Sequence, residues 1–349
     1  MIKNLRIKDI AKLAGVSPGT VDRVIHNRGQ VTEENRLNIL KIIEEVNYKP
    51  NLLARSLANK KNYLIVSLCP GFNLQNDYWK APDHGIERAA REISDYNISV
   101  KRFYFDQFSV QSFKKQLKEI LELNPDGVLL SPVFREETID FAQKLDEKQV
   151  PYIFIDSNID GLNNLSYLGQ NSFQSGFLAA RLLSYSTPAD SSILIVQIGG
   201  SEPSNQAIRR EEGIHNFLSQ TPGKYYYTHI DLDTQNPKSK ANFSEQISKG
   251  DVKGIIVINS KAFEVATIMN DLGIRDKNLI GYDLLPENIK YLKEGLISFL
   301  IAQRPEEQGY KGIMSLFNSL VVKSKVEKNN YLPIDILTGE NIDYYLNYI

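Results

Sequence analysis

Short apolar segments alternate with stretches of helical periodicity from about residue 62 onward, and this alternation constrains the fold more than any other feature of the chain. A helix is predicted over residues 78–94, directly after the first apolar segment. Near-continuous apolar strands separated by helices are typical of parallel sheets that are covered on both faces. We therefore predict an α/β fold with strands at 63–68, 127–131, 152–156, 193–198, 254–259, 278–282 and 297–302, and an edge strand within 333–338.

Polar side chains stand at the carboxyl ends of these predicted strands, namely Ser131, Asp156, Asn259, Asp283 and Gln303. Just ahead of the first predicted helix lie Asn76, Tyr78 and Trp79. Ligands of parallel sheets bind at the carboxyl ends of strands, so these side chains are expected to meet in one cleft. Amides, carboxylates and aromatic rings together favour a hydroxylated ligand with an apolar ring face. A single carboxylate after a strand is more often a helix cap, and that alternative stays open for each residue alone.

The first 28 residues predict a helix-turn-helix. Apolar residues at helical spacing mark a first helix from about residue 8 to 13, and Gly15 supplies the backbone freedom of the turn. Ser17 is a suitable N-cap, with Pro18 at the first position of a second helix that ends near His26. The polar side of this second helix would lie in a DNA major groove. Two short helices joined by Gly can also form an ordinary corner, which is the commoner explanation of an isolated match.

A third helix is predicted after Thr32, which is expected to cap it, with acids in its first turn. Its expected buried face is formed by Leu37, Ile39, Leu40, Ile42, Ile43 and Val46. Pro50 ends this helix, because the residue before a proline is pushed out of the α region. One further short helix is predicted from Asn51, with Leu53 and Leu57 on one side. A helix of that length is marginal in water, so we expect it to form only against a partner.

Charge is divided unevenly along the chain. The first 60 residues contain eleven Lys and Arg against six Asp and Glu, whereas the whole chain contains 41 and 42. A basic head on an acidic body is what contact of one end with phosphates requires. The single Cys69 excludes a disulfide framework, and no Cys/His pair has metal-ligand spacing, so no metal or other cofactor is expected. Without a long apolar run or a leader pattern, we expect a soluble cytoplasmic protein with no membrane partner.

The head resembles the LacI/GalR family of bacterial transcriptional regulators. The resemblance is carried by D-I-A-x-x-A-G-V-S at 9–17, T-V-x-R-V at 20–24, N-x-x-x-V-T-x-x-x-R at 27–36 and Y-x-P-N-x-x-A-R-x-L at 48–57. It implies that Leu57 is a minor-groove wedge on a hinge helix, which works only when two such helices meet. A homodimer on a near-palindromic double-stranded operator is therefore implied. The DNA-binding residues implied are Ser17, Pro18, Gly19, Thr20, Asp22, Arg23, His26, Asn27, Asn51, Ala54, Arg55 and Leu57.

The positions that read bases depart in part from the family pattern. Arg23 stands where the recognition helix of the family presents its arginine, which suits the O6 and N7 atoms of guanine. Pro18 and Gly19 occupy the two positions that vary to choose operators, and they carry almost no hydrogen-bonding capacity. Base discrimination is therefore expected to rest on Arg23, Asp22 and His26.

The remainder of the chain is similar to the periplasmic sugar-binding protein fold that forms the core of these regulators. The effector-binding residues implied or placed nearby are Asn76, Tyr78, Trp79, Ser131, Asp156, Ser157, Asn205, Ile208, Asn259, Asp283 and Gln303. Ser157 and Ile208 stand where we expect arginines of ribose-type binding proteins, so the oxygens that can be held differ. Arg210 is interpreted as a structural residue, and Ser201, Ser204 and Gln206 as further candidates for lining the cleft.

The predicted architecture is thus a small all-α helix-turn-helix domain followed by a two-lobed, periplasmic-binding-protein-like α/β core. The expected limits are 1–50 for the head, 51–61 for the hinge helix and linker, 62–160 with 303–325 for the first lobe, and 161–302 with 326–349 for the second. The predicted function is a transcriptional regulator, a repressor, whose operator affinity is controlled allosterically by a small carbohydrate effector. A solute-binding protein for sugar uptake is the alternative, and a sugar-converting enzyme is disfavoured because no nucleophile elbow, phosphate loop or metal cluster is written in the sequence.

Overall fold

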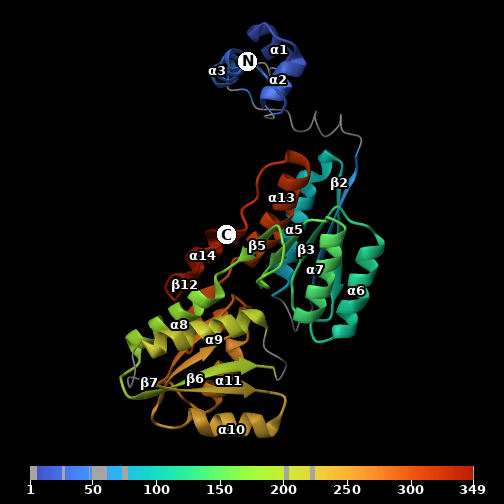
Figure 1. Cartoon of the computed structure of the whole chain (residues 1–349). Coiled ribbons are helices and arrows are strands. Elements are labelled where there is room, and N and C mark those ends of the chain that lie inside the picture. Colours follow the sequence, from blue (N-terminus) through green and yellow to red (C-terminus); the bar gives the residue numbers. More distant parts are fainter. Residues whose placement is uncertain are drawn as a thin grey trace. The chain divides into compact units, whose positions relative to one another are not determined.

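The computed structural model describes residues 6–25, 28–46, 48, 61–72, 78–199, 204–220 and 225–348. The chain divides into two compact units (Figure 1): the residues up to Lys61 together with Asp95–Asn97, and the remainder of the chain. The predicted hinge helix, with Asn51, Ala54, Arg55 and Leu57, lies outside the described residues, as do His26, Asn27 and Asn76.

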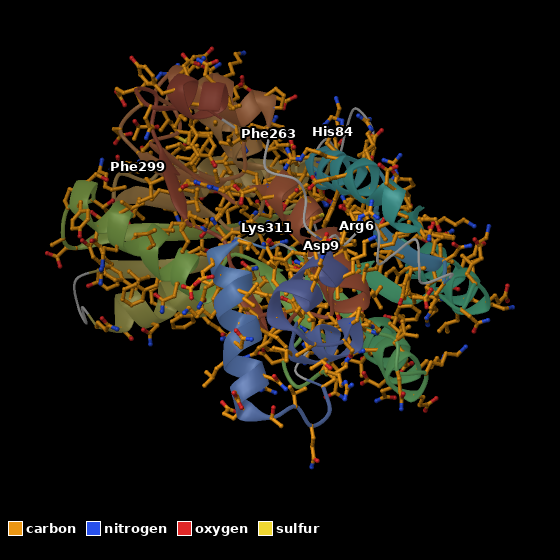
Figure 2. All side chains as sticks on the ribbon, turned by 90° about the horizontal axis from the view of Figure 1, so that it is seen from above. Arg6, Asp9, His84, Phe263, Phe299 and Lys311 are labelled. Carbon is orange, nitrogen blue, oxygen red and sulfur yellow. The ribbon has the colours of Figure 1, made fainter. Side chains whose placement is uncertain are left out.

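The head contains the helices α1 (Ile7–Ala14), α2 (Pro18–Ile25) and α3 (Glu33–Glu45). The turn between α1 and α2 depends on Gly15, whose φ of 66° is a left-handed conformation that glycine adopts without strain. The Ser17 Oγ accepts a hydrogen bond of 3.1 Å from the backbone N–H of Thr20, which satisfies a free donor of the first turn of α2. At the start of α1, the Asp9 carboxylate accepts the backbone N–H of Arg6 at 2.8 Å (Figure 2). These bonds explain why the predicted helix-turn-helix forms.

The core of the head is smaller than the sequence pattern predicts. Its buried residues are Ile10, Ala11, Val21, Val24 and Ile39. Leu37 and Leu40 were expected to be buried on α3, but they are 60% and 46% exposed. Three short helices enclose only a narrow apolar stripe, so the flanks of α3 remain in solvent. Thr32 stands at the N-cap of α3, but its side chain makes no capping hydrogen bond.

The first lobe of the core is a sheet with strand order β11-β5-β4-β3-β1-β2, in which all neighbouring strands are parallel. Its strands are β1 (Tyr63–Pro70), β2 (Ile98–Phe105), β3 (Gly127–Leu130), β4 (Tyr152–Ile155), β5 (Ser166–Gly169) and β11 (Asn329–Tyr331). The associated helices are α5 (Lys80–Ile93), η1 (Ser94–Tyr96), α6 (Val110–Glu122), α7 (Arg135–Glu147), α13 (Pro305–Phe317) and the π-helix η2 (Asn318–Val322).

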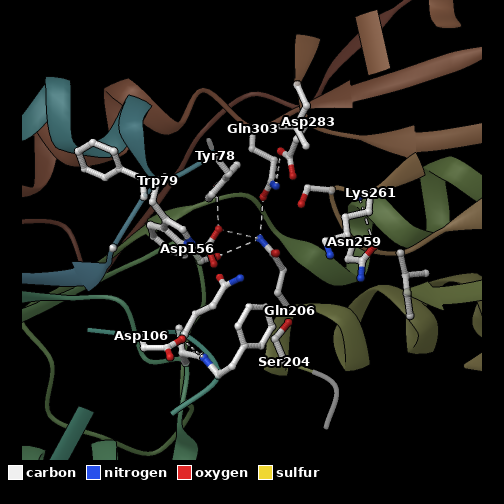
Figure 3. A pocket seen from close by; sticks show the side chains of 18 of the residues that line it. Tyr78, Trp79, Asp106, Asp156, Ser204, Gln206, Asn259, Lys261, Asp283 and Gln303 are labelled. Atoms are coloured by element: carbon white, nitrogen blue, oxygen red, sulfur yellow. Dashed lines mark hydrogen bonds between the residues drawn. The ribbon is translucent and has the colours of Figure 1, made fainter. Parts of the chain in front are cut away.

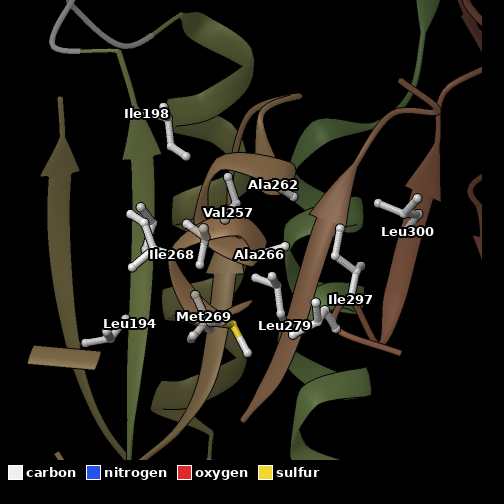
Figure 4. Close-up of a cluster of buried hydrophobic side chains, with 14 of the residues drawn as sticks. Leu194, Ile198, Val257, Ala262, Ala266, Ile268, Met269, Leu279, Ile297 and Leu300 are labelled. Atoms are coloured by element: carbon white, nitrogen blue, oxygen red, sulfur yellow. The ribbon is translucent and has the colours of Figure 1, made fainter. Parts of the chain in front are cut away.

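The second lobe repeats this plan with strand order β12-β10-β9-β8-β6-β7, and only the β10–β12 pair is antiparallel. Its strands are β6 (Ser191–Ile198), β7 (Tyr225–Leu232), β8 (Val252–Val257), β9 (Asn278–Tyr282), β10 (Phe299–Ala302) and β12 (Asp335–Leu337). Its helices are α8 (Ser172–Ser186), α9 (Asn205–Ser219), α10 (Pro237–Ile247), α11 (Ala262–Asp271), α12 (Pro286–Lys293) and α14 (Ile342–Tyr348). Fully buried aliphatic side chains such as Val257, Met269 and Leu279 fill the space beneath the strands (Figure 4).

The predicted α/β fold class is confirmed, and every predicted strand is present. Four strands were not predicted: β2, β5, β7 and β11. The edge strands β2 and β7 expose many of their side chains, so they lack the continuous apolar run of a central strand. The lobe limit predicted near residue 160 is corrected, because β5 belongs to the first sheet and the chain crosses to the second lobe only at α8. Likewise β11 returns to the first sheet, although residues 326–349 were predicted to lie in the second lobe.

One pair of helices in each lobe packs with the two backbones in contact: α13 against α5, and α8 against α9 (Figure 1). A Cβ atom on Gly85 of α5 would lie 2.0 Å from the carbonyl oxygen of Glu306, and one on Gly309 of α13 would lie 2.1 Å from that of Pro82. In the second lobe, a Cβ atom on Gly176 would lie 1.9 Å from the Arg210 carbonyl oxygen. Only glycine permits these approaches, which bring the N-terminal ends of α5 and α9 to the cleft between the lobes.

We predict that Gly176→Ala destabilises the core by about 1–3 kcal/mol, because the methyl group must force the backbones of α8 and α9 apart. Urea unfolding of the full chain measures this change. Gly250→Ala is the matched control, since a Cβ atom there meets nothing within 4 Å and needs no left-handed backbone. Equal free energies of unfolding for the two variants would contradict the proposed role of the close approach.

Candidate functional site

A cavity of about 690 Å³ lies between the two lobes of the core (Figure 3). Side chains from both lobes line it. The structure brings together eight of the residues that the sequence analysis named for the cleft: Tyr78, Trp79, Asp156, Ser204, Gln206, Asn259, Asp283 and Gln303. The prediction that strand ends and the start of α5 converge on one cleft is therefore met by these residues.

A continuous chain of hydrogen bonds crosses the cavity from one lobe to the other (Figure 3). The Tyr78 hydroxyl donates to Asp156 Oδ1 at 2.7 Å, and Gln206 Nε2 donates to the Asp156 carbonyl oxygen at 3.1 Å. The same Gln206 amide donates to Gln303 Oε1 at 2.6 Å, and Gln303 Nε2 donates to Asp283 Oδ1 at 2.6 Å. Both carboxylates thus have partners within the protein, and a ligand has to replace or extend this network.

Asp156 and Asp283 occupy corresponding places in the two lobes. Each directly follows the third strand in the order of its sheet, β4 for Asp156 and β9 for Asp283. Both have a left-handed backbone conformation, with φ of 68° and 70°. Such a conformation is uncommon for residues other than glycine and persists only where the surroundings hold it. The Asp156 N–H is held by Gln308 Oε1 at 2.8 Å, and the Asp283 N–H by the Ile301 carbonyl oxygen at 3.0 Å.

Burial changes the ionisation of these groups. It raises the pKa of Asp283 to about 7, although the Arg210 guanidinium and the Gln303 amide act in the opposite direction. Burial also raises the pKa of Asp156, against the hydrogen bond from Tyr78 and the charge of Arg210. The pKa of the Tyr78 phenol is raised well above its ordinary value by burial and by the neighbouring Asp156, so Tyr78 is a hydrogen-bond donor at neutral pH.

Arg210 lines the cavity, which the interpretation of this residue as structural did not anticipate. It is 1% exposed, and its guanidinium lies 3.7 Å from the centroid of the Tyr282 ring. Its Nη1 donates to the Ile258 carbonyl oxygen at 2.8 Å, whereas Nε and Nη2 have no partner in the described part of the chain. A buried donor without a partner is costly, so an acceptor on a ligand that reached these two atoms would remove that cost. Helical spacing was the missed signal, because Arg210 follows Gln206 at i+4 on α9.

Several aromatic and charged residues of the cavity were not predicted. They are Tyr104 and Phe105 at the end of β2, Phe72, Asp106 and Phe108 in the segments after β1 and β2, and Lys261 and Phe263 at the start of α11. Trp79 and Tyr78 stand edge to face, with ring centroids 5.1 Å apart. Rings around convergent amides and carboxylates suit a hydroxylated ligand, because each ring covers C–H surface while the polar groups bind oxygens.

Four selected residues lie elsewhere. Ser131 is fully buried after β3 and does not line the cavity. Ser157, Asn205 and Ile208 line a separate pocket of about 270 Å³. On α9 the reason is the helical turn, since positions 205 and 208 face away from positions 206 and 210. Ser157 lies on the other side because its chain neighbour Asp156 takes the left-handed conformation.

The second helix of the head presents an exposed polar face. Ser17, Pro18, Gly19 and Arg23 are exposed, Thr20 and Asp22 are half-buried, and Val21 and Val24 point into the core. The Arg23 Nε donates to the Gly19 carbonyl oxygen at 3.1 Å, and Ser17 Oγ lies 2.9 Å from Thr20 Oγ1. This face can meet a DNA groove, with Arg23 as its longest donor.

Neither a group of residues suited to hold a metal ion nor a helix able to cross a membrane occurs in the described parts of the chain.

Fold and site define a class of protein: a helix-turn-helix head joined to a two-lobed ligand-binding core. The family model of lacI-type bacterial regulatory proteins matches residues 6–51, and that of the periplasmic binding protein domain matches residues 70–324. The chain is 26% identical to the sucrose operon repressor of Streptococcus mutans, over 97% of this chain and 99% of that one. It is 34% identical to the regulator RegA of Clostridium saccharobutylicum over 145 residues, less than half of either chain.

A putative LacI transcriptional regulator from Bacteroides fragilis has a similar crystal structure, with a TM-score of 0.75 and 37% identity. The match covers 82% of this chain and all of that one. The chain belongs to the lacI family of transcriptional regulators, with a core of the periplasmic-binding-protein type. It is a DNA-binding protein, as the sequence predicted.

We predict that the stability of the core falls as pH rises from about 5 to 7, in part because of Asp283. The ordinary pKa of an aspartate is 3.8, whereas burial raises that of Asp283 to about 7 in the folded state. Between these two values the unfolded chain releases this proton and the folded chain keeps it, so the free energy of unfolding falls as pH rises. One proton corresponds to at most ~1.4 kcal/mol per pH unit. In Asp283→Asn this component is absent, and urea unfolding at pH 5, 6, 7 and 8 should show a flatter profile.

The control is Asp140→Asn, since Asp140 is an exposed carboxylate on α7. A profile of Asp283→Asn that runs parallel to those of the wild type and of this control would refute the raised pKa.

Proposed function

We propose that this protein is a repressor whose affinity for operator DNA is controlled by a small carbohydrate in the cavity between the lobes. The observation that supports the carbohydrate is the hydrogen-bond chain from Tyr78 through Asp156, Gln206 and Gln303 to Asp283, surrounded by aromatic rings. The name of the Streptococcus mutans relative, a sucrose operon repressor, points in the same direction. The alternative, a solute-binding protein for uptake, does not account for the lacI-type head.

In this proposal the exposed face of α2 enters the major groove. Arg23 reads guanine, and Asp22 and His26 contribute to base discrimination. The segment around Leu57 opens the minor groove from a pair of hinge helices. A pair requires a homodimer, which binds a near-palindromic operator. The protein acts in the cytoplasm. Half-sites about one helical turn apart follow from the twofold axis of such a dimer.

The control by ligand follows from the cavity. Because partners of the ligand come from both lobes, binding favours a particular angle between them, and that angle sets the distance between the two hinges of a dimer. By linkage, DNA binding and ligand binding change each other by the same factor, typically ~1–3 kcal/mol. Both induction and corepression are compatible with this coupling.

We predict that Arg23→Ala weakens binding to a selected operator at least about tenfold, which corresponds to one lost bidentate contact with a base. The operator is obtained by selection from genomic fragments with the wild-type protein. Fluorescence anisotropy at fixed salt then compares the selected DNA with a scrambled duplex, to which binding should change far less. Arg275→Ala, at an exposed position of the core, is the control. Equal losses on both duplexes would show that Arg23 contacts only phosphates.

We predict that one member of a panel of sugars, sugar acids, polyols and nucleosides raises the unfolding temperature of the protein. A ligand at a hundred times its dissociation constant stabilises the folded state by ~2.7 kcal/mol. The shift should disappear in Asp283→Ala and persist in Asp140→Ala. A panel without any response would refute the carbohydrate proposal while leaving the DNA-binding family assignment intact.

A further inference from the structure

A second polar pocket opens beside the cavity, where the chain crosses from the first lobe to the second. Its volume is about 270 Å³, and the start of α8 forms one of its walls. The two lobes meet at this pocket through a hydrogen bond of 3.3 Å from Arg135 Nη1 to Asn205 Oδ1. We refer to it as the crossover pocket. Gln206 lines both the crossover pocket and the main cavity, so its side chain borders both spaces.

Three residues that line the crossover pocket each carry a buried polar atom that has no hydrogen-bond partner in the described part of the chain. The atoms are Ser157 Oγ, Asn158 Oδ1 and Gln170 Oε1. Ser157 and Gln170 are only 4% and 1% exposed. The rest of the Gln170 amide is fixed, since its Nε2 donates to the Ala302 carbonyl oxygen at 2.6 Å and to that of Pro333 at 2.8 Å. Its Oε1 atom therefore cannot turn away to find another donor.

Buried acceptors of this kind are normally satisfied, because an unmade hydrogen bond costs about 1–3 kcal/mol. Two of the three atoms are amide oxygens, which accept only, and the third is a hydroxyl, which can accept as well. The missing partner is thus a group rich in hydrogen-bond donors. A further pocket, of about 530 Å³, is lined by no residue with such an unpartnered buried atom in the described part of the chain.

The crossover pocket also has an aromatic wall. Tyr331 of β11 is 52% exposed and stands edge to face with Tyr167, with centroids 6.1 Å apart. Phe173 lies at the start of α8, and the Arg209 guanidinium is 5.7 Å from its ring centroid. Aromatic rings together with acceptors that lack a donor suit a second hydroxylated sugar ring. Its C–H surface would face the aromatic rings, and its hydroxyl groups would donate to Ser157, Asn158 and Gln170.

We propose that the crossover pocket is a second subsite for a polyhydroxylated unit. This inference rests on the proposed carbohydrate function of the main cavity and extends it. The unit has two possible sources: the second ring of a disaccharide effector that also fills the main cavity, or a separate monosaccharide or polyol. In both cases Gln206 is the boundary between the subsites, and its amide exchanges partners when the crossover pocket fills.

Calorimetry on the full chain tests the subsite with sucrose, maltose and lactose and with glucose, fructose and galactose as their one-ring counterparts. A disaccharide that fills both subsites should bind one per chain, at least about tenfold more tightly than its constituent rings, the factor that ~1.4 kcal/mol provides. Separate occupants would appear as two monosaccharides per chain. Either stoichiometry supports the subsite and identifies its source.

Two variants locate the effect. Tyr331→Ala removes the aromatic wall at a largely exposed position, and Ser157→Ala removes a hydroxyl without adding volume. Each should reduce the advantage of the disaccharide, or the affinity of the second monosaccharide, about five- to tenfold, with one-ring binding in the main cavity unchanged. The matched control is Tyr226→Ala, a tyrosine 66% exposed on the edge strand β7 that lines neither space.

The proposal is overturned if monosaccharides bind one per chain and no disaccharide binds better, since the pocket then holds only water. It is overturned equally if the advantage of a disaccharide survives both variants. If no sugar binds at all, the carbohydrate function of the main cavity fails, and the subsite fails with it.

Discussion

The close approach of two helix pairs is the constraint on which the rest of the core depends. In each lobe, one helix that begins at a chain crossing, α13 or α8, packs backbone to backbone on the helix that follows the first strand of that lobe, α5 after β1 or α9 after β6. Glycines at the contact leave no room for a Cβ atom. This packing fixes where α5 and α9 begin, and their N-terminal ends carry Trp79 to one wall of the cavity and Gln206 and Arg210 to the other.

The polar groups of the cavity make hydrogen bonds to one another, and a ligand must replace these bonds with its own. Tyr78 and the two glutamine amides provide the donors that a sugar would otherwise offer to Asp156 and Asp283. The same carboxyls are destabilised as anions by burial, and the Arg210 guanidinium supplies a compensating positive charge. A ligand hydroxyl can donate a hydrogen bond to a carboxylate and accept one from Arg210 at the same time, so it can satisfy both groups.

The sequence predicted the central strands and the residues directly behind them, because a strand buried on both faces reads as an apolar run and its end is easily located. Asp156, Asp283 and Gln303 were found in this way. The edge strand β2 was missed because Lys101 and Arg102 interrupt its apolar pattern. The sequence analysis did not place Arg210 at the cavity, and it placed Asn205 and Ile208 there wrongly. The direction of these side chains depends on how α9 is rotated against α8, and that rotation is set by glycine contacts between residues far apart in sequence.

The matching positions of Asp156 and Asp283 have a consequence for how strongly such a core can hold a ligand. Each lobe carries one half of the recognition surface, so a lobe by itself would offer a small molecule one carboxylate and would bind it with low affinity. Held on one chain, the halves act like the two arms of a bivalent binder, in which engagement of the first raises the effective concentration of the second. Affinity is then set as much by the geometry of the crossings that tether the halves as by any atom in contact with the ligand.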